Sequence, residues 1–197
     1  MPAGRPRGFD PEKALDAAIC TFWKHGYEGA SLEALTTAMG INRPSLYAAF
    51  GDKADLFEKA VRRYQATNWG AIGEALSAAP DIDSLIDGYF AAVRQNVGGE
   101  GSPRGCLVAS VLGEASEADP RWRALASEVT NGGRETIAAS LRRFVPADAA
   151  ARTASLMGVT TGGLAVLARS GASADAITEG FAAAVSAAKA LAGTKAA

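Results

Sequence analysis

The sequence predicts an all-α protein of about nine helices, with a small N-terminal domain followed by a larger helical one. Apolar residues recur at three- and four-residue spacing along most of the chain, whereas the alternating β-branched runs typical of strands are few. Alanine dominates the composition, and caps, prolines and glycines separate many of the periodic segments. The chain has 197 residues, 48% of them hydrophobic and 21% charged, which is enough for a sizeable core in one or two domains.

The first helix is expected over residues 10–25. Asp10 stands at the N-cap position, and Pro11 with a glutamate follows in the first turn, where both favour helix initiation. The helix is expected to stop at Gly26. His25 is the single histidine of the chain, and its place in the last turn suits the helix dipole better than metal binding or catalysis.

Residues 30–51 predict two short helices joined by a tight turn. Ser31 is placed to cap the first helix, and Gly40 follows its last apolar residue, where a left-handed C-cap favours glycine. Asn42 is placed to cap the second helix, and Pro44 fits only in its first turn. This is the layout of a helix-turn-helix, whose second helix presents its N-terminal residues to base edges in the major groove of DNA.

The segment from Asp10 to Tyr64 resembles the N-terminal DNA-binding domain of the TetR family of bacterial transcriptional repressors. The resemblance is carried by four stretches in matching order and spacing: FWKHGYEGAS (Phe22 to Ser31), LEALTTAMGI, SLYAAF and GDKADLF. One position departs, because the family often has a histidine where this chain has Ala49. The resemblance implies a three-helix helix-turn-helix domain, then a C-terminal helical domain that binds ligand and dimerises.

Candidate DNA contacts follow from the local chemistry and from this resemblance. Arg43 and Ser45 are the candidates for base edges, because arginine can hold guanine with two hydrogen bonds. By resemblance, Tyr47 and Lys53 contact phosphates, and the free N–H groups at a helix N-terminus also favour an anion there. The basic N-terminal arm either reaches the DNA or is a solvated tail. The full set is Arg5, Arg7, Ser31, Asn42, Arg43, Pro44, Ser45, Tyr47 and Lys53.

The helix that opens at Lys53 is expected to end within the weakly patterned residues 66–80. We therefore expect a DNA-binding domain over residues 1–64 and a ligand-binding and dimerisation domain over residues 65–197. The further helices predicted in the second domain span residues 81–97, 106–114, 119–144, 146–169 and 175–191.

The last two predicted helices have almost no charge at their centres, and the first of them contains three glycines. Each glycine costs about 1 kcal/mol relative to alanine inside a helix, a cost that makes sense where another backbone approaches closely. These helices therefore predict an isologous interface with a second copy, as the family resemblance also implies; an ordinary monomeric core is the alternative. The candidate interface residues are Gly158, Thr161, Gly162, Leu164, Ile177, Phe181 and Val185.

A small-molecule effector is expected among the helices of the second domain. The candidate lining is apolar and aromatic, which suggests a hydrophobic or aromatic ligand, although such residues also serve as plain core. The candidates are Trp69, Tyr89, Phe90, Cys106, Trp122 and Thr160. Cys106 follows an Arg-Gly pair that resembles a segment in one subset of the family, so this residue is either a sensing thiol or a small buried residue.

The sequence carries no signature of an enzyme, a resident cofactor or a metal. It has no glycine-rich phosphate loop, no nucleophile elbow and no metal-ligand spacing. Cys20 and Cys106 form no disulfide framework, which favours the reducing cytoplasm. No apolar run reaches the ~18 residues that a membrane span needs, so no membrane partner is expected.

We therefore expect a homodimeric repressor that binds a palindromic double-stranded DNA operator and is released by a small effector. The net charge is −1, and residues 1–63 hold nine Lys/Arg against eight Asp/Glu, so charge alone does not suggest nucleic acid. This leaves open an interaction adaptor without sequence-specific DNA binding. A thiol- or metal-responsive regulator acting through Cys106 is the other alternative.

Overall fold

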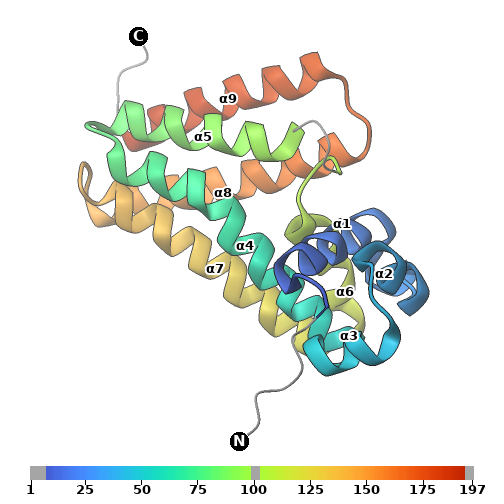
Figure 1. Cartoon of the computed structure of the whole chain (residues 1–197). Coiled ribbons are helices and arrows are strands. Elements are labelled where there is room, and N and C mark those ends of the chain that lie inside the picture. Colours follow the sequence, from blue (N-terminus) through green and yellow to red (C-terminus); the bar gives the residue numbers. More distant parts are fainter. Residues whose placement is uncertain (1–7, 99–102, 194–197) are drawn as a thin grey trace, which may run out of the picture. The chain divides into compact units, whose positions relative to one another are not determined.

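The computed structural model describes residues 8–98 and 103–193, and every regular element within these ranges is a helix, as predicted. The chain divides into two compact units, Met1–Tyr64 and Gln65–Ala197, and the boundary falls inside the fourth helix. The elements are α1 (Pro11–Gly29), α2 (Leu32–Met39), α3 (Arg43–Phe50), α4 (Lys53–Ala78), α5 (Ile82–Gly98), the π-helix η1 (Val108–Leu112), α6 (Gly113–Ala118), α7 (Pro120–Leu141), α8 (Ala147–Arg169) and α9 (Ala174–Ala192) (Figure 1).

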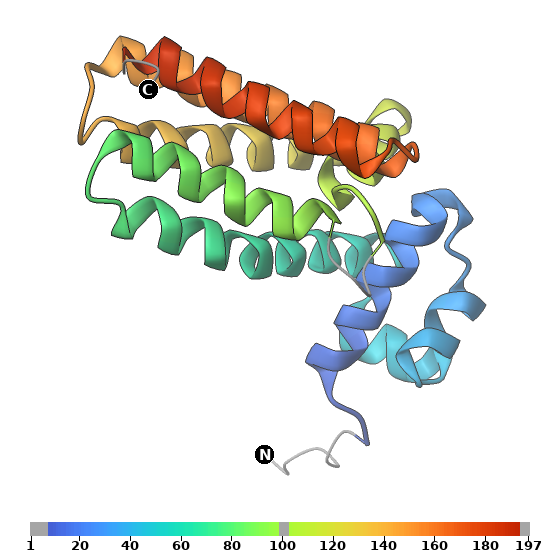
Figure 2. The ribbon, with the colours of Figure 1, turned by 90° about the horizontal axis from the view of Figure 1, so that it is seen from above.

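The N-terminal unit consists of α1, α2, α3 and the first turns of α4 (Figure 2). Aromatic side chains form much of its core. The ring of Phe22 on α1 lies 4.9 Å from that of Phe57 on α4, edge to face. The rings of Trp23 and Tyr64 join the same two helices at 5.1 Å. Edge-to-face pairs of this kind add stability beyond the area they bury, so α4 and α1 form the frame that carries the two short helices.

The predicted caps of the N-terminal unit are confirmed. The Asp10 carboxylate accepts the backbone N–H of the second residue of α1 at 2.9 Å. Gly40 ends α2 in the left-handed region, with φ 65° and ψ 29°, as the sequence suggested. Gly26 breaks α1 where a stop was expected, with φ 76° and ψ 171°, and the segment then continues to Gly29.

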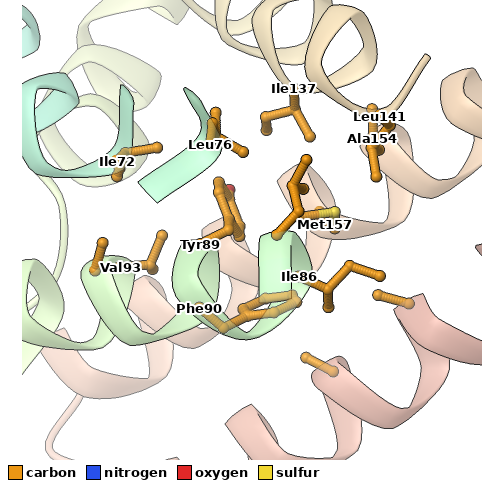
Figure 3. Close-up of a cluster of buried hydrophobic side chains, with 14 of the residues drawn as sticks. Ile72, Leu76, Ile86, Tyr89, Phe90, Val93, Ile137, Leu141, Ala154 and Met157 are labelled. Carbon is orange, nitrogen blue, oxygen red and sulfur yellow. The ribbon is translucent and has the colours of Figure 1, made fainter. Parts of the chain in front are cut away.

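The C-terminal unit is a helical bundle in which α8 contacts α5, α7 and α9, and α5 also packs on α9. Figure 2 shows α9 running alongside α8 and α5. The interior is apolar, and Figure 3 shows how α4, α5, α7 and α8 contribute to it. The labelled core residues are Ile72, Leu76, Ile86, Tyr89, Phe90, Val93, Ile137, Leu141, Ala154 and Met157.

The segment over residues 106–114 differs in detail from the sequence-based expectation. The predicted helix over residues 106–114 is split into η1 and α6, and Gly105 before it has φ 97°. A Cβ at Gly105 would lie 2.7 Å from the backbone oxygen of Ala165 on α8, so only glycine allows this close approach.

The fourth helix passes through most of the weakly patterned segment and ends at Ala78. Its C-terminal end is held by the guanidinium of Arg143, which donates to the backbone oxygens of Leu76 at 2.8 Å and Ala79 at 2.6 Å. A cation at this end of a helix also suits the helix dipole. Within the described ranges, no helix has the length and hydropathy that crossing a lipid bilayer requires.

Candidate functional site

Helix α3 has one buried face and one exposed face. Leu46 and Phe50 anchor it, each almost fully buried in the N-terminal unit. Arg43 and Tyr47 lie beside this buried pair on the helix surface and are exposed, Tyr47 to 49%. Arg43, Pro44 and Tyr47 are thus exposed side chains in the N-terminal half of α3, where a partner molecule could reach them.

The sequence-predicted caps hold both short helices in place. The Ser31 hydroxyl accepts the backbone N–H of Ala34 at 3.1 Å, at the start of α2. The side-chain oxygen of Asn42 accepts the backbone N–H of Ser45 at 2.9 Å, at the start of α3. Pro44 is exposed in the first turn of α3, where its missing N–H costs no helical hydrogen bond. These residues therefore set the start of α3, beside the exposed Arg43.

Lys53 begins α4, and its amine lies against the end of α1. The Nζ atom donates to the backbone oxygen of Glu28 at 3.2 Å and lies 4.8 Å from the centre of the Tyr27 ring. A cation over an aromatic face and beside a helix-end carbonyl is favourably placed. Arg5 and Arg7, the other basic candidates, lie outside the described residues.

The C-terminal unit contains a partly buried polar contact between two helices of its core. The hydroxyl groups of Tyr89 on α5 and Thr161 on α8 lie 3.1 Å apart. Burial raises the pKa of Tyr89 to about 12, and the nearby Cys106 thiol acts in the same direction. In Figure 3 the Tyr89 ring lies with Leu76 and Met157 around it, so its hydroxyl is a polar atom in apolar surroundings.

Comparisons with known proteins place this arrangement in a family. A family model described as "Bacterial regulatory proteins, tetR family" matches residues 14–60, which include α2 and α3. The HTH-type transcriptional repressor BdcR of Escherichia coli (strain K12) is 32% identical over 168 residues, which cover 85% of this chain and 83% of BdcR. The chain belongs to the TetR family.

Further relatives of this TetR-family chain agree with the assignment. The HTH-type transcriptional repressor ComR of the same strain is 38% identical over 107 residues, a match that spans 53% of this chain and half of ComR. The TetR-family regulator CifR, solved as a cysteine mutant with a 26-base-pair operator DNA, superimposes with a TM-score of 0.81 at 30% identity, covering 93% of this chain and 99% of that one. The chain is a DNA-binding transcriptional regulator and not an enzyme.

Four of the six candidate effector residues of this TetR-family chain, Trp69, Tyr89, Phe90 and Cys106, lie in or against one apolar core cluster, but on different sides of it. Tyr89 is close to Cys106, whereas Phe90 faces α9, where its ring lies 6.3 Å from that of Phe181. Trp69 packs on α7, so closely that a Cβ at Gly133 would lie 2.7 Å from its ring.

The remaining two effector candidates, Trp122 and Thr160, are not members of that core cluster. Trp122 is buried near the start of α7, outside the main core cluster. The Thr160 hydroxyl bonds the backbone oxygen of Leu156 on its own helix at 2.7 Å. It is the adjacent Thr161, expected at the dimer interface, that meets Tyr89 instead.

The candidate dimer residues of the TetR-family chain also divide into two groups. Leu164 and Phe181 are buried in the core of their own chain, and Ile177 and Val185 pack partly against that core, so these side chains point inward. Gly158 and Gly162 meet open space, since a Cβ added at either would touch nothing within 4 Å.

Sequence reasoning missed the large apolar side chains that the last two helices expose. They are Val159, Val166, Leu167 and Leu191. Val159, Gly163 and Val166 follow one another at spacings of four and three residues, which places them on one side of a helix. The sequence therefore contained this exposed stripe. It was hidden because the opposite face of α8 is equally apolar.

Proposed function

We propose that this protein is a homodimeric repressor in which the α3 helices of two copies bind a palindromic operator. The observation that carries the proposal is that Leu46 and Phe50 fix α3 in the N-terminal unit while Arg43 and Tyr47, next to them on the helix surface, remain exposed. Helices of this kind place N-terminal side chains against base edges while flanking groups bind phosphates. Arg43 and Ser45 are assigned to bases. Arg5, Arg7, Ser31, Asn42, Tyr47 and Lys53 are assigned to the DNA backbone, with Pro44 shaping the start of the helix.

Dimerisation is supported by the surface of α8 and α9. Val159, Val166 and Leu167 leave apolar area exposed on α8, beside glycines that have open space within the chain. Glycines inside a helix lower its stability, and among the described residues of the same chain no neighbour lies close enough to explain Gly158, Gly162 or Gly163. A second copy packed on this face would bury the exposed side chains and use the room that the glycines leave.

An effector site is supported by polar groups inside the C-terminal core. The Tyr89 hydroxyl meets Thr161 and is close to Cys106. Ser110 follows Cys106 by one helical turn, and among the described residues its buried hydroxyl has no hydrogen-bond partner. An apolar or aromatic ligand with one hydrogen-bonding group would match such surroundings, because buried polar atoms otherwise lose their hydrogen bonds to water.

The direction of regulation follows from relatives. BdcR and ComR are named as repressors, and the solved CifR complexes contain operator DNA. By similarity we assign repression to this chain, with release when the effector binds the DNA-incompetent conformation more tightly than the competent one. Its place of action is the bacterial cytoplasm, where the operator lies.

A mobility-shift titration tests this function. Full-length protein is mixed with a duplex enriched from a random library or with a shuffled duplex of the same length. The proposal predicts that the enriched duplex binds at least about 1,000-fold more tightly, and that affinity falls steeply as salt rises. Equal affinity for both duplexes would instead indicate an adaptor that does not read sequence.

A second regulatory input, through the Cys106 thiol, is favoured by its position near Tyr89. Alkylation at Cys106 would add bulk beside a buried phenol and disturb the surrounding core. Iodoacetamide treatment should then weaken operator binding of the wild type and of Cys20→Ser, but not of Cys106→Ser. Equal sensitivity of Cys106→Ser would remove the thiol from the mechanism.

A further inference from the structure

Helix α3 is short and has few anchors. It spans eight residues, from Arg43 to Phe50, or about 12 Å along its axis. Its N-terminal end is fixed by the Asn42 cap, and its inner face by Leu46 and Phe50. Apolar packing of this kind is non-directional, so it resists separation better than it resists small rotations or tilts of the helix.

The C-terminal end of α3 is held by a cation from another helix. Lys59, on α4, donates from Nζ to the backbone oxygen of Phe50, the last residue of α3, at 2.7 Å. This is a short bond between a charged donor and a helix-end carbonyl, a type roughly twice as strong as a neutral hydrogen bond. The cation also lies at the end of the helix dipole where positive charge is favoured.

The turn between α3 and α4 has a fixed conformation, which determines where Lys59 lies relative to Phe50. Gly51 has φ 85°, and Asp52 and Asp55 cap the start of α4 by exchanging side-chain to backbone bonds of 2.9 and 3.3 Å. Because the turn fixes where α4 starts, the Lys59 amine ties the orientation of α3 to the frame formed by α1 and α4. Lys53, by contrast, bonds the end of α1 and not α3.

We propose that Lys59 is a positioning residue for DNA recognition: its bond to the Phe50 carbonyl sets the orientation of α3 and thereby sequence specificity. The inference rests on the proposed role of α3 in reading the operator. Hydrogen bonds to base edges need donor–acceptor distances of about 2.7–3.2 Å, so a shift of about 1 Å at α3 breaks them. Phosphate contacts tolerate such a shift better, because they depend more on charge than on direction.

Two variants separate positioning from other roles of Lys59. Lys59→Met keeps the aliphatic stem but removes the donor and the charge, whereas Lys59→Arg keeps both. Lys13→Met, at an exposed lysine of α1, is the matched control for the loss of one charge from the same unit. Thermal unfolding followed by circular dichroism verifies that each variant folds.

The first measurement needs no DNA and therefore does not depend on the proposed function. Amide hydrogen exchange of the free protein should be faster in α3 of Lys59→Met, by about tenfold, and unchanged in α2. Lys59→Arg should exchange like the wild type. Unchanged exchange in α3 of Lys59→Met would overturn the inference whether or not the protein binds an operator.

The second measurement compares affinities for an enriched duplex and a shuffled duplex of equal length over a range of salt. Lys59→Met should lose about tenfold in affinity for the enriched duplex and little for the shuffled one, with an unchanged salt slope. Lys59→Arg should restore the preference. Equal losses on both duplexes with a salt slope reduced by about one would identify a direct phosphate contact and contradict positioning. No preference in the wild type itself would contradict the proposed function instead.

Discussion

Several side chains of the N-terminal unit have structural roles that can be predicted directly from the sequence. Asp10, Ser31 and Asn42 cap helices because their short polar side chains satisfy N–H groups within three residues along the chain. Gly40 ends α2 because the left-handed conformation favours glycine. These roles depend on neighbours in sequence and not on tertiary packing, so they could be predicted. The bond from Lys59 to Phe50 joins different helices and could not.

Arg43 is the residue whose loss should change base preference. Replacing it with alanine should cost roughly 1–3 kcal/mol of operator binding, because arginine bonds guanine through two donors. The loss should concentrate at one base position in each half-site. Affinities for operators with single base-pair changes provide the measurement.

The control for Arg43 is Lys24→Ala, which removes an exposed cation from α1. It should lower affinity evenly over all the operator variants, if it lowers affinity at all. An Arg43→Ala protein with the base preferences of the wild type would show that Arg43 does not read a base.

Tyr89 should make stability depend on pH in the alkaline range. Its pKa is raised from 10.0 to about 12 by burial, so the unfolded chain loses the phenol proton near pH 10 while the folded chain keeps it until about pH 12. Below pH 10 this group leaves the free energy of unfolding unchanged. Between pH 10 and 12 the wild type should lose roughly 2–3 kcal/mol more than Tyr89→Phe.

Urea unfolding of the two proteins at several pH values measures this difference. At neutral pH, Tyr89→Phe should be less stable by about 1 kcal/mol, because the bond to Thr161 is lost. Parallel stability curves for the two proteins above pH 10 would mean that the phenol is not buried as described.

At the scale of helices, periodicity predicted the elements but not which face points inward. Both faces of α8 are rich in alanine, glycine and aliphatic residues, so spacing alone could not separate Leu164, which is buried, from Val159, which is 75% exposed. The same ambiguity placed Phe181 at an interface, although it packs on Phe90. The division of residues 106–114 into η1 and α6 had no signal in the sequence.

Helix α8 supplies a test of the interface between copies. Val159→Glu should convert a dimer to a monomer, because an unpaired charge buried at each of two symmetric positions costs about 3–5 kcal/mol. The monomer should keep its fold, since the side chain is exposed within the chain. Sedimentation velocity over a range of concentrations measures the change.

The control for Val159→Glu is Ala139→Glu, which adds the same charge at an exposed position of α7. It should leave the dimer intact. A Val159→Glu protein that sediments like the wild type would place the interface elsewhere or show that there is none.

A substitution at Gly162 tests the same interface, because it should stabilise the single chain while it weakens the dimer. Its Cβ position is empty within the chain, and alanine is favoured over glycine in a helix by about 1 kcal/mol. Gly162→Ala should therefore stabilise the isolated chain but weaken the dimer where the two backbones are close. An increase in both chain stability and dimer affinity, measured by unfolding and by sedimentation, would argue against close backbone contact at this glycine.

At the scale of the whole molecule, the proposed function combines a DNA-reading unit with a helical bundle that would hold the partner copy and the effector. Family membership is supported by a relative that matches 85% of the chain, and the fold by a solved regulator bound to DNA. Thermodynamic linkage requires that an effector which weakens operator binding is itself bound more weakly when the operator is present. The identity of that effector depends on details of packing around Tyr89 that the sequence does not reveal.

The central claim is that two copies of α3 bind DNA together, and an unbiased selection from random double-stranded DNA with the full-length protein tests it most directly. The account predicts enrichment of an inverted repeat whose half-sites lie about one helical turn, or a whole multiple of it, apart, bound by two chains. Recovery of no preferred sequence, or of a single unrepeated site bound by one chain, would contradict it.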